Sequence, residues 1–86
     1  MPEISRFYGI VIRMYFDDHS PPHFHAIYNG QEAVISINDL SVIRGQLSAR
    51  AYGLVMEWAY LHRSEILEAW KRAKSMENPG RIAPLD

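Results

Sequence analysis

Three of the four histidines of the chain lie close together, at His19, His23 and His25. His23 and His25 are two residues apart, so both side chains point to the same face if this segment is a β-strand. Two imidazoles at that spacing can bind one metal ion, and His19 or Asp18 from the preceding loop can complete the ligand set. Because the chain has no cysteine, the predicted ligands are nitrogen and oxygen atoms, which suit Zn²⁺ or another metal that prefers imidazole.

The same histidines also suit a metal-free action on RNA. An imidazole titrates near neutral pH and can act as a general acid or base. Arg13 can bind a phosphate and stabilise its developing charge, and Tyr15 can stack on an unpaired base. Such a site is typical of a small metal-independent ribonuclease. Its candidate catalytic residues are His23, His25, Arg13 and Tyr15, and the same predicted surface includes Glu32 and Arg44.

Both hypotheses compete with a purely structural interpretation of these residues. In that interpretation the strand histidines are half-exposed and hydrogen-bonded to neighbours, while His19 caps the loop and Arg13 is a solvated surface residue. His62 lies inside an apolar helical stripe and is predicted to pack there rather than to act as a fourth ligand. Trp58 and Trp70 are predicted to belong to the core or to an interface.

Length and charge limit the class of protein. The 86 residues are enough for one small domain, residues 1–86, and the formal net charge of −1 argues against a generic polyanion binder. Without cysteine the chain has no disulfide, and a domain of this size often needs a partner, here a homo-oligomer or another protein. The N-terminal residues do not resemble a secretory signal, and no run of about 18 apolar residues occurs. The expected location is cytoplasmic, with no membrane partner.

The first half of the chain, residues 4–45, is predicted to be β-rich. Residues 7–16 alternate and predict one strand, and residues 17–22 form a loop because two prolines cannot donate to a sheet. Asn29-Gly30 predicts a two-residue hairpin turn with Tyr28 opposite Gln31. One face of this hairpin is apolar and should meet a helix: Phe24, Ala26, Ala33, Ile35 and Ile37. The histidines then lie on the other, more open face.

A short further strand is predicted over residues 40–44, with Gly45 at its end. Residues 48–77 change to helical periodicity, with Ser48 as the cap. They form either one long helix or two shorter helices broken near His62, with Ser64 as the second cap. The tail, residues 78–86, is predicted to be extended, and its apolar residues can dock back onto the domain: Ile82 and Leu85. The predicted fold is α+β, a three- to four-stranded antiparallel meander whose one face is covered by the helical part.

The chain resembles an uncharacterised bacterial family, domain of unknown function 4160. The resemblance is carried by residues 4–16 and by the segment Asp18-His19-Ser20-Pro21-Pro22-His23-Phe24-His25. In the helical part it is carried by two segments, Leu54-Val55-Met56-Glu57-Trp58 and Leu61-His62-Arg63, together with Trp70. It implies an association with toxin–antitoxin-like gene pairs, in which a neighbouring gene encodes the protein partner.

Two classes of function therefore remain open. The chain is either a toxin-like effector that acts on RNA, or a non-catalytic binding or regulatory module of such a pair. A histidine-based metal-binding domain is a further alternative, with Zn²⁺ as the expected cofactor and His19, His23, His25 and Asp18 as candidate ligands.

Overall fold

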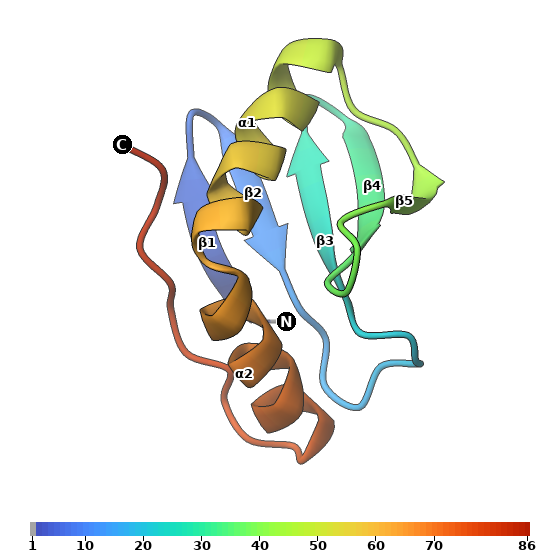
Figure 1. The fold of residues 1–86 in the computed structure, drawn as a ribbon, viewed down its shortest axis with the longest axis vertical. Helices are drawn as coiled ribbons and strands as arrows, with labels where there is room; N and C mark the ends of the chain where they lie inside the picture. The colour runs from blue at the N-terminus through green and yellow to red at the C-terminus, as the bar shows by residue number, and fades with distance from the viewer. Residues whose placement is uncertain (1) are drawn as a thin grey trace.

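A computed structural model describes residues 2–86. Its elements are β1 (Glu3–Phe7), β2 (Ile10–Arg13), β3 (His23–Tyr28), β4 (Gln31–Ser36), β5 (Val42–Gly45), α1 (Ala49–Leu61) and α2 (Arg63–Lys74). The strands form one antiparallel sheet in chain order, α1 crosses one face of it, and the C-terminal segment runs back beside β1 (Figure 1). The predicted α+β class and the antiparallel meander are confirmed, with five strands in place of three or four.

The prediction of one strand over residues 7–16 is wrong, because Tyr8 and Gly9 form a two-residue turn between β1 and β2. Their φ angles are 51° and 82°, and a tight hairpin turn needs positive φ at both positions. Phe7 pairs with Ile10 across this turn, so the two side chains share one face of the sheet. Phe7 consequently lies in the core rather than on the opposite face, where continuous alternation along one strand would place it.

The hairpin of β3 and β4 has the predicted register. Asn29 and Gly30 have φ angles of 51° and 81°, and Tyr28 stands opposite Gln31. The apolar face of the hairpin enters the core, where no member is more than 2% exposed: Phe24, Ala26, Ala33, Ile35 and Ile37. The two histidines of β3 lie on the opposite face, as the alternation of a strand requires.

The predicted short strand before the helices is β5, which begins at Val42 and ends at Gly45. Gly45 has a φ of 79°, and a Cβ atom at this position would overlap the backbone carbonyl of Glu32. Glycine is therefore required where β5 approaches β4 so closely. Gln46 N–H also donates to the Glu32 carbonyl at 3.1 Å, so the end of β5 is fixed beside Glu32.

The helical half consists of two helices rather than one. α1 begins at the predicted cap, where the Ser48 hydroxyl accepts a hydrogen bond from the Ala51 N–H at 3.3 Å. The chain leaves helical geometry at His62, between α1 and α2. The prediction of Ser64 as the second cap is wrong, because α2 has already begun at Arg63. None of the helices in the described part of the chain is long and apolar enough to cross a membrane.

The C-terminal segment covers the free edge of β1. The Ile82 N–H donates to the Ile4 carbonyl at 2.7 Å, and the Trp58 indole N–H donates to the Ala83 carbonyl at 2.9 Å. Ile82 and Leu85 pack against the core, as predicted. The tail therefore shields one edge strand from pairing with another chain.

Candidate metal centre

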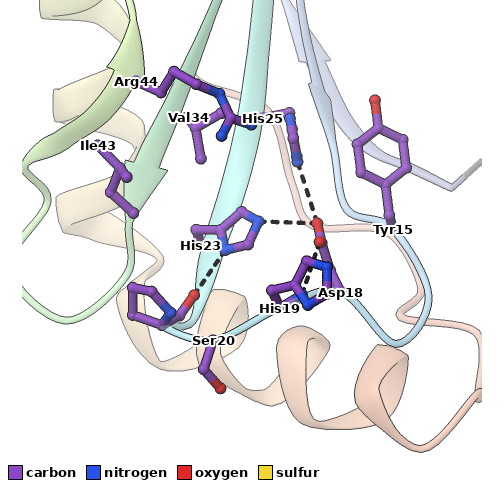
Figure 2. Close-up of a pocket in the computed structure, with 10 residues that line it drawn as sticks. Tyr15, Asp18, His19, Ser20, His23, His25, Val34, Ile43 and Arg44 are labelled. Carbon is purple, nitrogen blue, oxygen red and sulfur yellow. Dashed lines mark hydrogen bonds and ion pairs between the residues drawn. The ribbon is translucent and has the colours of Figure 1, made fainter.

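The strand histidines are buried, contrary to the prediction of an open face. His23 and His25 are 8% and 5% exposed. The ring of Trp70 on α2 lies 5.0 Å from the His23 ring, and Tyr15 lies edge-on to His25 with 4.4 Å between centroids. The loop between β2 and β3 and the strand β5 complete the cover (Figure 2). The sequence pattern could not show this cover, because Trp70 and β5 lie far along the chain and the adjoining loop is held in place by α2.

The covering loop is attached to the end of α2. The Lys74 ammonium binds the Asp17 carboxylate at 3.3 Å and the Asp18 carbonyl at 3.0 Å. The Asp17 N–H donates to the Ala73 carbonyl at 3.1 Å. These three contacts hold the loop against the helix and place the Asp18 carboxylate in front of the two histidines.

One oxygen of Asp18 faces both rings (Figure 2). The distance from Asp18 Oδ2 to His23 Nε2 is 2.9 Å, and the distance to His25 Nε2 is 3.4 Å. One ligand atom from each of the three residues lies within 4.8 Å of the other two. The structure therefore brings together three of the four residues predicted as metal ligands.

The other nitrogen of each ring has its own acceptor. His23 Nδ1 lies 2.7 Å from the Pro21 carbonyl oxygen, and His25 Nδ1 lies 2.7 Å from Glu32 Oε2. A carbonyl and a carboxylate only accept hydrogen bonds, so both Nδ1 atoms must carry the proton. In the neutral rings, the Nε2 atoms are then bare lone pairs that point toward a carboxylate. Such a convergence of three acceptors is favourable only with a cation, or with added protons, between them.

Asp18 provides the negative charge at this point. Burial raises the pKa of its carboxyl, but hydrogen bonds outweigh that effect: one comes from the His19 N–H, and the rings of His23 and His25 add theirs when their Nε2 atoms carry a proton. The His19 N–H donates to Asp18 Oδ1 at 2.8 Å, which leaves Oδ2 directed at the rings. The pKa of Asp18 is therefore below its ordinary value, and the carboxylate is ionised at neutral pH.

A cavity of about 360 Å³ opens beside the three residues. Val34 of β4 and Ile43 of β5 form an apolar wall, while the exposed residues His19 and Arg44 add polar groups. Three protein ligands with an adjoining cavity are typical of a catalytic metal site, whereas structural zinc sites are closed by a fourth protein ligand.

The other predicted residues lie outside this group of three, although Tyr15 and His19 line the same cavity. Tyr15 contacts the ring of His25, and His19 lines the cavity with its side chain outside the group of three. Arg13 is the cross-strand neighbour of His25 but does not line the cavity. His62 lies at the helix break, where its Nδ1 is 2.6 Å from Glu65.

Sequence reasoning placed Glu32 on the histidine face without assigning it as the partner of His25. A signal was present in the predicted register, since His25 stands opposite Val34 and Glu32 is two residues from Val34 on the same face. Diagonal neighbours on one face are within reach of long side chains. The carbonyl of Pro21 had no comparable signal, because its direction depends on the conformation of the loop.

Comparison with known proteins identifies the family. Residues 9–71, which include the whole site, match the family described as Domain of unknown function (DUF4160). The chain belongs to this family. The predicted resemblance is thereby confirmed, and the DUF4160 match extends from the β1–β2 turn into α2. No curated protein and no solved structure matches the chain.

Proposed function

We propose that this DUF4160 protein binds a divalent metal ion through Asp18, His23 and His25, and that Zn²⁺ suits the donor set best. The observation that carries the proposal is the direction of the two rings. Each ring donates its Nδ1–H to an outer acceptor and turns Nε2 toward the same oxygen of Asp18. Histidine ligands of metal ions have this arrangement, with a carboxylate or a main-chain carbonyl behind the ring.

The distances support a shared ion. Ligands at about 2.0–2.1 Å from a tetrahedral zinc ion lie about 3.3–3.4 Å from one another. The 3.4 Å between His25 Nε2 and Asp18 Oδ2 already has this value. The 2.9 Å between His23 Nε2 and the same oxygen needs to widen by about half an ångström, a change that a side-chain rotation supplies.

The proposal includes a hydrolytic role, since three protein ligands leave the fourth position to water or substrate. An ion held by Asp18, His23 and His25 would supply hydrolytic chemistry, because zinc lowers the pKa of water to about 7. All three residues line the cavity, so a small substrate would have access to an ion that they held. The residues of the chain then hold the ion, fix both ring tautomers and limit the entry of bulk water.

Metal analysis tests the proposal directly. Tag-free protein is equilibrated with Zn²⁺, freed of excess metal and examined by elemental analysis and titration calorimetry. We expect one zinc ion per chain, and a loss of affinity of about a hundredfold or more in His23→Gln and in His25→Gln. His62→Gln is the matched control, because this histidine lies outside the site and should leave affinity unchanged. A wild-type protein without zinc, or a His25→Gln variant that binds as tightly, contradicts the proposal.

A metal-free action on RNA is the second candidate function, and the carboxylate contacts of the rings favour it. With a proton on each Nε2, His23 and His25 become imidazolium ions that donate to Asp18. They can then exchange protons with RNA, while Tyr15 beside His25 stacks on a base. This function predicts RNA cleavage in the presence of EDTA that is lost in His25→Gln. Cleavage that needs added zinc favours the metal centre, and tight binding of a partner protein without cleavage favours a binding module.

A further inference from the structure

We infer that the ligand of this cavity carries a phosphate group, and that Arg44 binds it beside the metal ion. The inference rests on the proposed metal centre. Arg44 belongs to β5 and lines the same cavity as Asp18, His23 and His25. Figure 2 shows its side chain extending from β5 toward β3, on the side where His25 lies.

The pairing of the strands determines where Arg44 stands. His25 pairs with Val34, and Val34 pairs with Arg44, so the three side chains form one row on the same face of the sheet. Neighbouring strands are about 4.8 Å apart, which puts the backbone of Arg44 about 10 Å from that of His25. The side chain of Arg44 leans across this interval, and the cavity between its guanidinium and the histidines has room for a small anion.

The guanidinium of Arg44 is available to a ligand. Within residues 2–86, it makes no hydrogen bond or ion pair with another residue, although it has five N–H donors. Its position at the cavity is therefore not explained by a structural contact. Four other arginines have such contacts: Arg6 and Arg81 with Glu3, Arg63 with the Ile37 carbonyl, and Arg72 with the Pro79 carbonyl. Arg13 and Arg50 have none within residues 2–86, but they do not line the cavity.

The charges around the cavity favour an anion. A divalent ion and the Arg44 guanidinium together carry three positive charges, whereas Asp18 and Glu32 carry two negative charges. The guanidinium of arginine binds two oxygens of a phosphate side by side, and a further phosphate oxygen remains for the metal ion. A carboxylate has only two oxygens and cannot satisfy both partners in this way. The arrangement therefore fits a phosphate better than a carboxylate.

The shape of the cavity favours a phosphate ester with a small organic group. Its volume of about 360 Å³ is near the lower end of the range for small-molecule sites, which is about 300–1,000 Å³. Val34 and Ile43 offer an apolar wall to the organic part. A free phosphate monoester fits this arrangement fully, because it has three non-bridging oxygens. A phosphodiester of a nucleic acid has two, so one of them would have to be shared between Arg44 and the metal ion.

Calorimetry with zinc-loaded protein tests the inference. The probes are phenyl phosphate as a monoester, diphenyl phosphate as a diester and benzoate as a carboxylate of similar size. We expect at least one phosphate ester to bind more tightly than benzoate, and the tighter ester identifies the source of the phosphate. Arg44→Ala should weaken ester binding about tenfold or more while zinc affinity stays within twofold. Arg44→Lys should be intermediate, because it keeps the charge and loses the two-pronged geometry.

Arg50→Ala is the matched control, since Arg50 is exposed at the start of α1 and does not line the cavity. It should bind the ester as the wild type does. Equal ester binding by Arg44→Ala and wild type overturns the inference, and so does benzoate that binds as tightly as the tighter of the two esters. A protein that holds one zinc ion but no phosphate ester overturns this inference alone. A protein that holds no zinc overturns the metal centre and the inference with it.

Discussion

The two faces of β3 are both buried, but for different physical reasons. Phe24 and Ala26 are 0% exposed and face the core, where burial is driven by the hydrophobic effect and needs no particular orientation. His23 and His25 are nearly as buried on the opposite face, where each ring nitrogen has a polar partner. The residues on one face of β3 therefore stabilise the fold, and those on the other face hold polar groups in fixed directions. Changes on the two faces should have separable effects.

The largest effect on stability is expected on the apolar face. Phe24→Ala removes a fully buried ring that packs 5.8 Å from Trp58, and it should lower the free energy of unfolding by about 3–5 kcal/mol. Urea unfolding of the metal-free protein measures this change. If Phe24→Ala does not fold, Phe24→Leu retains most of the volume and should show a smaller loss. A loss below about 1 kcal/mol in Phe24→Ala would show that this face does not carry the core.

Zinc should stabilise the folded protein only through the residues on the histidine face of β3. At a free zinc concentration a hundred times the dissociation constant, binding adds about 2.7 kcal/mol to the stability of the folded protein. Thermal unfolding with and without EDTA should show this gain in the wild type and in Phe24→Leu. The gain should be absent in His25→Gln. If zinc stabilises His25→Gln as strongly as the wild type, the effects of the two faces are not separable.

A single outer contact should have a smaller effect. Glu32→Gln keeps an acceptor for His25 Nδ1 but removes the negative charge, and zinc affinity should fall about ten- to a hundredfold. Glu65→Gln makes the same change at the carboxylate that contacts His62 and should leave zinc affinity unchanged. Calorimetric titration of both variants measures the difference. Equal affinities in the two variants would mean that Glu32 does not support the site.

The smallest effect is expected at Glu3 of β1, where this strand meets the C-terminal tail. Hydrogen bonds from Arg6 and Arg81 lower the pKa of Glu3 to about 2 from an ordinary value of 4.5. A carboxyl whose pKa is lower in the folded protein stabilises it above the ordinary pKa and loses this effect as pH falls. Wild-type stability should therefore decline between pH 4.5 and about 2 more than that of Glu3→Gln. Because these charges are largely solvated, the difference is small, and parallel pH profiles of thermal unfolding would contradict it.

Local turn chemistry explains which parts of the fold could be predicted. Asn29 and Gly30 both tolerate positive φ, so their position determined the register of β3 and β4 and the face of the histidines. Tyrosine rarely adopts positive φ, and the alternation of apolar residues continues through the turn that Tyr8 forms with Gly9. The first hairpin was therefore missed, and with it one strand and the burial of Phe7.

The residues of the candidate site were easier to predict than its burial. The spacing of His23 and His25 places both rings on one face, and Asp18 was within reach from the adjoining loop. The cover over them depends on contacts far apart in the chain, such as Lys74 with Asp17 and Trp70 with His23. No local pattern encodes such contacts, so a buried site was interpreted as an open one.

The acceptors behind the two histidines differ in kind. His23 is held by the main-chain carbonyl of Pro21, which no side-chain exchange at that position removes. His25 is held by the side chain of Glu32, which is 48% exposed and can be exchanged without disturbing the core. The acceptor of the His23 ring is therefore fixed by the backbone, whereas the acceptor of the His25 ring can be changed by a single substitution. A substitution at position 32 alone would change how strongly the His25 ring donates electrons to a bound metal ion. It would thereby change the Lewis acidity of that ion and leave the ion in the same place.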